Sequence, residues 1–199
     1  MLKVVVKNGA PRSGKGIAAK HMTDLVNSSE GFITAFHMEF KDELFKVAAN
    51  TLGISVEGFL HGYDKTVGEL YKDDPVTLNF ALMDEGVTEE SWVKDCPWHE
   101  VNGEMYSKRQ WLIHMSENVI KPSFGASAFG DMFVNSMPEE GLVFCSDSGF
   151  PEELQPVIDH VGVENVLVVR IHRDGCTYEG DSRSMLTEEM FEENTCPTF

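Results

Sequence analysis

Apolar positions in the first fifty residues follow a strand pattern, then a helix pattern, then both again. The run from Leu2 to Val6 contains three consecutive valines, which is typical of a parallel strand buried on both faces. From Ser13 to Val26 the apolar positions recur with helical spacing, and Ser13 is the expected N-cap. The same criteria predict a second strand over 32–38 and a second helix over 42–52.

The alternation resumes after residue 107. Helices are predicted over 108–120, 128–137 and 151–161, and strands over 141–145 and 165–171. Pro122 is expected to end the first of these helices, whereas Pro151 suits the first turn of the last. Strands that alternate with helices predict an α/β fold, a three-layer sandwich with a mostly parallel central sheet and helices on both faces.

The stretch 53–107 departs from this alternation. It is rich in acidic, aromatic and glycine residues, and we expect an irregular or partly helical insertion there. Its segment Tyr63-Asp64-Lys65 is a candidate for substrate contact. Aromatic core packing is favoured over base stacking for the three tryptophans, Trp92, Trp98 and Trp111. Because no repeat or linker divides the sequence, we expect a single domain over residues 1–199.

Length and composition narrow the class of protein. The chain has 199 residues, 42% of them hydrophobic, which is enough for one substantial core. No apolar stretch has the length that crosses a bilayer or forms a signal-peptide core, so we expect a cytoplasmic protein without a membrane partner. The four cysteines lie far apart without a CxxC pair, which argues against a zinc site or a disulfide framework.

The formal net charge of -17 argues against nonspecific binding to nucleic-acid polymers, because such binding needs a basic face. An acidic protein also repels nucleotides at long range, so a phosphate site has to be built from local cations and backbone N–H groups. The chain has only five arginines, and each is a candidate for such contacts: Arg12, Arg109, Arg170, Arg173 and Arg183. For those outside the glycine-rich segment described next, surface ion pairs are the alternative, and Arg170 could be structural because it lies within a predicted strand.

A phosphate-binding loop is predicted between the first strand and the first helix. The segment Gly9-Ala10-Pro11-Arg12-Ser13-Gly14-Lys15 satisfies the pattern G-x-x-x-x-G-K. Glycines let the backbone turn its N–H groups inward, the helix N-terminus adds positive potential, and the lysine reaches the β- and γ-phosphates. The residues expected to contact a nucleotide are Gly9, Ala10, Pro11, Arg12, Ser13, Gly14, Lys15, Gly16 and Ile17.

The residue after the loop lysine departs from many P-loops. These carry a Ser or Thr that binds Mg²⁺, whereas this chain has Gly16. Magnesium is therefore expected to be held mainly by nucleotide phosphates and water. Asp147, which follows a predicted buried strand, is the candidate for an outer-shell carboxylate, and a turn or helix-capping aspartate is the alternative.

The sequence resembles a known family at several points. Gly9-Ala10-Pro11 and Gly14-Lys15-Gly16 resemble the loop of adenylate kinase and other nucleoside monophosphate kinases. The core Arg12-Ser13-Gly14-Lys15 looks more like the deoxynucleoside monophosphate kinases of tailed bacteriophages. Further similarity to the phage family lies in Arg109-Gln110-Trp111-Leu112, in Leu142 through Asp147, and in Arg170 through Arg183, which resembles the lid region.

The resemblance implies transfer of the γ-phosphoryl group of ATP, with Mg²⁺, to the 5′-phosphate of a deoxynucleotide in the cytoplasm of an infected bacterium. It implies that Lys15 and the loop backbone bind the donor phosphates and that Arg12 binds the donor or transferring group. Arg109 is expected on the acceptor phosphate. Arg173 and Arg183 are expected to close over the reaction from a lid over residues 173–186, which excludes water.

Two features depart from this family. No arginine follows closely after Asp147, where the sequence is Ser148-Gly149, and the sequence after 171 leaves little room for a final strand and helix that would contact adenine. Together with the missing loop hydroxyl, they motivate a nucleotide-binding regulatory protein without transfer as one alternative. A P-loop ATPase or another small-molecule kinase is the other. The accepted bases, the sugar preference and a homodimer are left open.

Overall fold

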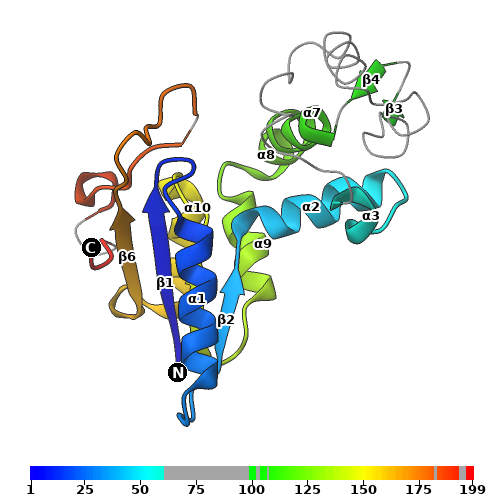
Figure 1. Cartoon of the computed structure of the whole chain (residues 1–199). Helices are drawn as coiled ribbons and strands as arrows, with labels where there is room; N and C mark the ends of the chain where they lie inside the picture. Colours follow the sequence, from blue (N-terminus) through cyan, green and yellow to red (C-terminus); the bar gives the residue numbers. More distant parts are fainter. Residues whose placement is uncertain (61–98, 102–103, 107, 182, 193–195) are drawn as a thin grey trace. The chain divides into compact units, whose positions relative to one another are not determined.

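The computed structural model of the chain describes residues 1–60, 99–101, 104–106, 108–181, 183–192 and 196–199 (Figure 1). The chain divides into two compact units. The first unit consists of Met1–Glu43 with Phe124–Phe199, and the second of Leu44–Ser123.

The first unit is built on a parallel sheet of four strands in the order β2-β5-β1-β6. The strands are β1 (Leu2–Gly9), β2 (Ala35–Met38), β5 (Gly141–Cys145) and β6 (Val166–Ile171). β1 pairs with β5 on one side and with β6 on the other, and its Val4 and Val6 are fully buried. Val4 and Val6 lie on one face of the strand, and Val5 on the other face is half-buried, so the apolar run in β1 packs against neighbours on both faces, more completely on the first.

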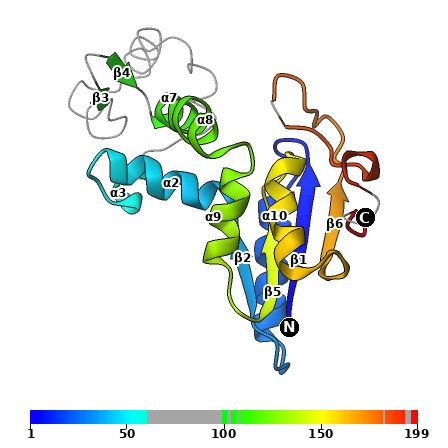
Figure 2. The same cartoon turned by 180° about the vertical axis from the view of Figure 1, so that it is seen from behind.

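Helices cover both faces of this sheet. α1 (Lys15–Ser28) packs on one face, against β1, β2 and β5, and Ala19 of α1 meets Ala35 and Phe144 in a buried cluster. α9 (Ala128–Ser136) and α10 (Pro151–Val161) lie together on the opposite face, which Figure 2 shows from behind. The predicted α/β class, with a parallel sheet between two helix layers, is confirmed.

The predicted boundaries agree best where apolar runs are bounded by glycine or proline. β5 and α10 begin and end at the predicted residues. The prediction of Ser13 as the N-cap of α1 is wrong, because Gly14 holds that position with φ 97° and no side chain caps the helix. The tight turn of the loop needs a left-handed residue there, which glycine adopts without strain.

The tail of the chain returns to the open edge of β6. Val168 N donates to Thr198 O at 2.7 Å, which gives a single bridge at that edge. Arg170 Nη2 lies 2.7 Å from Glu188 Oε2 in the 3₁₀ turn Glu188–Met190, and its guanidinium lies 4.3 Å from the centre of the Phe199 ring. Arg170 thus holds the tail against β6, which confirms the structural interpretation of this residue.

The second unit contains most of α2 (Phe40–Thr51), which begins in the first unit, and then α3 (Val56–Leu60). β3 (His99–Val101) pairs antiparallel with β4 (Glu104–Tyr106). A helical stretch follows: α7 (Lys108–Ile113), a π-helical segment (His114–Ile120) and α8 (Lys121–Phe124).

The prediction that Pro122 ends this helix is wrong, since Pro122 lies inside α8. Lys121 N bonds to Ser116 O, five residues back, so the backbone has already widened when it reaches the proline. Pro122 is then in the first turn of a new α-helical segment, where its missing N–H is tolerated.

Trp111 belongs to the core of the second unit. Its side chain is buried, its Nε1 donates to Ala48 O at 3.1 Å, and its ring stacks on that of His114 with centres 5.3 Å apart. The core interpretation is confirmed for Trp111. Trp92, Trp98 and the segment Tyr63-Asp64-Lys65 lie outside the described residues.

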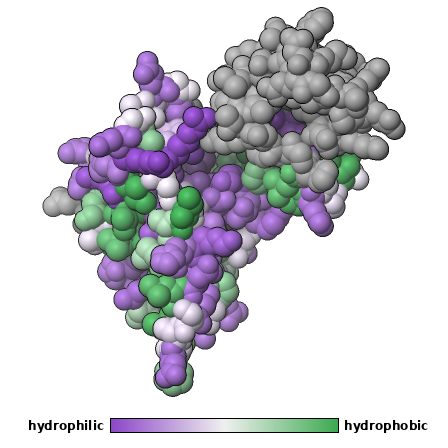
Figure 3. Space-filling model, viewed as in Figure 1, coloured by the Kyte–Doolittle hydropathy of each residue, from purple (hydrophilic) through white to green (hydrophobic). Residues whose placement is uncertain are grey.

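The surface of the first unit mixes apolar and polar side chains on the α1 side (Figure 3). Ile17 and Leu25 of α1 are 81% and 61% exposed. In the part of the chain that the structure describes, no helix combines the length and the apolar character required to cross a membrane.

Candidate phosphate-binding site

The predicted loop lies at the carboxyl end of the central strand. β1 ends at Gly9 and α1 begins at Lys15, and the loop is the turn between them. The connection from β1 to β2 runs through α1 on one face, whereas the connection from β5 to β6 runs through α10 on the other (Figures 1 and 2). The sheet order therefore switches between β1 and β5, and open α/β sheets bind ligands at the carboxyl ends of the strands at such a point.

The backbone of the loop contains residues with positive φ, and at Gly9 it lies close to the end of β6. Arg12 has φ 63°, and it is the single residue other than glycine with a positive φ in the described part of the chain. Gly14 has φ 97°, and a Cβ atom on Gly9 would lie 2.5 Å from Ile171 O. Left-handed residues in such a loop turn backbone N–H groups to one side, where they can hold an anion.

Lys15 folds back over the loop. Its side chain is buried, and Nζ donates to Gly9 O at 2.6 Å and to Ala10 O at 2.8 Å. The hydroxyl of Ser13 is also buried and has no hydrogen-bond partner within the described residues. A buried donor without a partner is costly, and a phosphate oxygen would satisfy it, so the loop fits the ligand predicted for it.

The predicted lid arginines lie in the same unit as the loop. Arg173 Nη1 donates to Arg12 O at 3.1 Å, so the segment after β6 reaches the loop directly. Arg183 binds the carboxylate of Asp181 through two N–H groups, at 2.8 and 2.5 Å, and these hydrogen bonds raise the pKa of Arg183. A Cβ atom on Gly149 would lie 2.5 Å from Arg183 Cβ, so glycine at 149 gives this arginine its space.

Asn8 links the lid segment to the loop, and sequence reasoning missed it. Its side chain is fully buried, Nδ2 donates to Ser184 O at 3.2 Å, and Oδ1 accepts from Leu186 N at 2.8 Å. The signal that could have found it is a carboxamide at the end of an apolar strand, directly before the loop. Such a group is buried only where its hydrogen bonds are satisfied.

The next two strands, β5 and β2, bring further polar groups to this edge. Ser146 follows β5 and donates from Oγ to Glu39 Oε1 at 2.5 Å, and His37 Nε2 lies 2.9 Å from the same hydroxyl. Glu39 Oε2 pairs with Lys41 Nζ at 2.8 Å. Burial raises the pKa of Glu39, but the charge of Lys41 and hydrogen bonds from Lys41 and Ser146 outweigh it, so its net pKa is lowered.

Asp147, the predicted outer-shell carboxylate, caps α2. Its Oδ1 accepts from Phe40 N at 2.7 Å and its Oδ2 from Lys41 N at 3.0 Å, which confirms the capping interpretation. Burial raises its pKa to about 7, and neighbouring Glu39 adds to the rise while Lys41 opposes it. Contact with magnesium stays a prediction for this residue.

Arg109 lies near the start of α7 in the second unit, where its side chain is half-buried. Its assignment to the acceptor phosphate stays a prediction. Arg12, Lys15, Arg173 and Arg183 thus all belong to the first unit, where Arg173 contacts the loop, and Arg109 belongs to the other.

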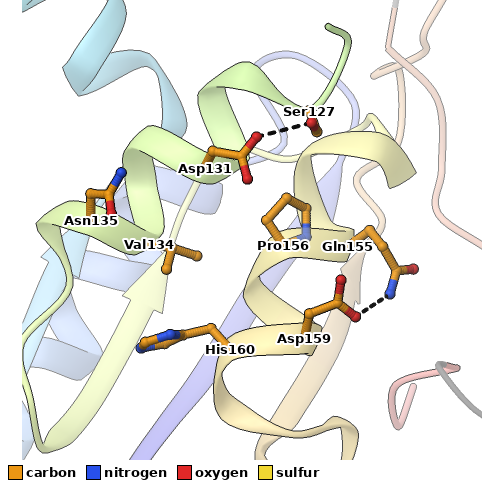
Figure 4. Close-up of a pocket in the computed structure, with 8 residues that line it drawn as sticks. All are labelled: Ser127, Asp131, Val134, Asn135, Gln155, Pro156, Asp159 and His160. Carbon is orange, nitrogen blue, oxygen red and sulfur yellow. Dashed lines mark hydrogen bonds between the residues drawn. The ribbon is translucent and has the colours of Figure 1, made fainter. Parts of the chain in front are cut away.

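The first unit also has a surface hollow of about 530 Å³ between α9 and α10 (Figure 4). Asp131 and Asp159 line it; Asp131 accepts a hydrogen bond from Ser127, the residue before α9, and Asp159 accepts one from Gln155 of α10. The remaining lining residues are Ser127, Val134, Asn135, Gln155, Pro156 and His160. Two carboxylates without a lysine or arginine among these lining residues do not suit a phosphate.

Comparison with known proteins adds no family to this picture. No protein-family model and no curated protein sequence matches the chain. Within the described residues, no three His, Cys, Asp or Glu side chains are placed to hold a metal ion.

Proposed function

We propose that the protein transfers the γ-phosphoryl group of ATP to a deoxynucleoside or nucleoside 5′-monophosphate and so produces the diphosphate. The observation that carries this proposal is the loop Gly9–Lys15 at the carboxyl end of β1, with Arg173 donating to the Arg12 carbonyl of that loop. The resemblance of the loop and lid segments to phage deoxynucleoside monophosphate kinases supports the choice of acceptor.

Each cation has a part in this reaction. Lys15 binds the β- and γ-phosphates in exchange for the loop carbonyls that it contacts now. The loop N–H groups and the Ser13 hydroxyl bind further donor oxygens. Arg12 binds the donor or transferring phosphoryl group. Arg173 and Arg183 neutralise charge on the transferring group, and Arg109 binds the acceptor phosphate.

The bond changes need no strong base. An oxygen of the acceptor 5′-phosphate attacks the γ-phosphorus, and the bond from that phosphorus to the β,γ-bridging oxygen breaks. The electron pair leaves with ADP, and because the attacking oxygen is already an oxyanion, no proton has to be removed. Catalysis then consists of positioning and charge neutralisation, and Mg²⁺ bound to ATP would supply part of the latter.

The acidic net charge of the chain fits a site in which nearby donor groups bind the nucleotide and long-range attraction has no part. With a net charge of -17, long-range attraction of nucleotides is absent, and the site depends on donors within the loop and lid. ATP and nucleoside monophosphates are cytoplasmic metabolites, so we place the reaction there.

The test is a coupled assay of ADP release with ATP, Mg²⁺ and each nucleoside monophosphate in turn. Lys15→Ala should lower the acceptor-dependent rate by about 100-fold or more, because it removes a donor that contacts the transferring group. Lys20→Ala is the matched control, since Lys20 is an exposed lysine on the same helix, and it should keep the wild-type rate.

Three outcomes separate the alternatives. Release that needs a monophosphate and Lys15 supports the kinase and identifies the accepted base. Release without any acceptor would indicate an ATPase. ATP binding without release under any condition would replace the proposal with a nucleotide-binding regulatory protein.

A further inference from the structure

Gly16 occupies the position where a P-loop serine or threonine would present its hydroxyl. It lies in the first turn of α1 and is exposed. A Cβ atom built on Gly16 would have one neighbour within 4 Å outside the adjacent residues, and this is Ser146 Oγ at 4.0 Å. A hydroxyl from the end of β5 therefore faces the space that the missing loop hydroxyl would enter.

The Ser146 hydroxyl is held by a carboxylate from the neighbouring strand. β5 and β2 run parallel with Cys145 opposite Met38, so the residues that follow them, Ser146 and Glu39, meet directly. Ser146 is 3% exposed, and its Oγ donates to Glu39 Oε1 at 2.5 Å. The parallel register thus fixes a hydroxyl–carboxylate pair beside the loop.

Such a pair is what P-loop proteins use for the cation of the nucleotide, with the hydroxyl on the loop and the carboxylate on a neighbouring strand. Here the hydroxyl comes from β5 and the carboxylate from β2. On the basis of the proposed function, we infer that Ser146 and Glu39 hold the divalent cation of bound ATP, and that Ser146 replaces the hydroxyl absent at Gly16.

The contacts of the neighbouring residues are consistent with Ser146 and Glu39 as the two protein ligands of the cation. Both oxygens of Asp147 accept backbone N–H groups at the start of α2, so this carboxylate has a structural task. Glu39 is instead held by side chains, and Lys41 Nζ, which lies 2.8 Å from its Oε2, would have to leave that oxygen for a cation to bind. The described part of the chain holds no cluster of three metal-binding side chains, so the remaining ligands have to be phosphate oxygens and water, as Mg²⁺ commonly accepts. His37, which is exposed, contacts the Ser146 hydroxyl and would give way to the cation.

The test measures cation binding apart from turnover. Complexes with β,γ-methylene-ATP are titrated with Mn²⁺ and followed by electron paramagnetic resonance, and binding of the analogue in EDTA is measured by calorimetry. Ser146→Ala should bind the analogue in EDTA as the wild type does, but should bind Mn²⁺ about tenfold more weakly.

Matched variants test whether the weaker Mn²⁺ binding comes from loss of the Ser146 hydroxyl itself. Ser148→Ala removes an equally buried hydroxyl two residues away, which donates to Lys7 O at 3.2 Å, and it should keep the Mn²⁺ affinity. Adding Gly16→Ser to Ser146→Ala should restore most of the lost affinity by placing a hydroxyl on the loop, whereas adding Gly16→Ala should not. If Ser146→Ala fails to fold, Glu39→Gln should show the same weaker binding.

The outcomes for this inference and for the proposed function are distinct. Wild-type Mn²⁺ affinity in folded Ser146→Ala would overturn the inference and leave the phosphotransferase proposal intact. Absence of analogue binding by the wild-type protein, with and without Mn²⁺, would refute the proposed function and the inference together.

Discussion

At Gly9 the start of the loop lies close to the end of β6, and Gly9→Ala tests that geometry. The new Cβ atom would lie 2.5 Å from Ile171 O and 2.8 Å from Ser13 Oγ. Carbon and oxygen atoms in proteins rarely approach within about 3.3 Å, so roughly 0.8 Å of displacement is needed at the end of β6. Gly9 and Ile171 are paired in the sheet, which leaves the backbone little freedom to move apart.

The expected cost follows from this overlap. Inserting a methyl group into a packed site that has to shift typically costs about 1–3 kcal/mol. A loss of about 2 kcal/mol lowers Tm by roughly 4–8 °C in a protein of this length. Because Ser13 is also displaced, the affinity for ATP should fall together with the free energy of unfolding.

Thermal unfolding followed by circular dichroism measures the first effect and calorimetry with ATP the second. Gly16→Ala is the matched control, since its Cβ atom would meet nothing closer than 4.0 Å and alanine favours the helix. It should leave Tm unchanged or raise it slightly. Equal Tm values for Gly9→Ala and the wild type would refute the close approach of the loop to β6.

Two further predictions concern other residues. Arg109→Ala should raise KM for the monophosphate more than it weakens ATP binding, and an unchanged acceptor KM in steady-state kinetics would remove Arg109 from the site. Lys7 is buried with Nζ 3.0 Å from Met22 Sδ, and burial lowers its pKa. The unfolded chain then holds that proton to higher pH, so stability should rise as pH increases towards 10.5, the ordinary lysine value. Lys7→Met should abolish this rise in urea titrations.

The sheet and its helices could be predicted because each leaves a local signal. The buried strands are continuous apolar runs, and α10 begins at a proline and is followed by Gly162, which has φ 86°. The π-helical segment before Pro122 left no such signal, because it depends on how the backbone widens ahead of the proline. The loop was predictable because its chemistry is encoded within seven consecutive residues.

The polar groups around the loop were harder to predict for a topological reason. Ser146 and Glu39 are 107 positions apart, and they meet only because β5 lies next to β2 in the sheet. Asn8 meets Ser184 across 176 positions. A single sequence indicates which residues end strands, but the order of the strands decides which of those residues become neighbours.

The internal partners of the cations indicate how each would respond to a phosphate. Lys15 and Arg173 donate to neutral backbone carbonyls, and a phosphate oxygen adds the attraction of a full negative charge, which makes it the stronger acceptor. Replacing the backbone carbonyls with phosphate oxygens therefore favours nucleotide binding at both Lys15 and Arg173. Arg183 already binds the Asp181 carboxylate through two N–H groups, so exchange there gains little. We expect Arg183 to keep Asp181 and to offer its charge from a fixed position, while Lys15 and Arg173 move onto the phosphates and draw the lid segment to the loop.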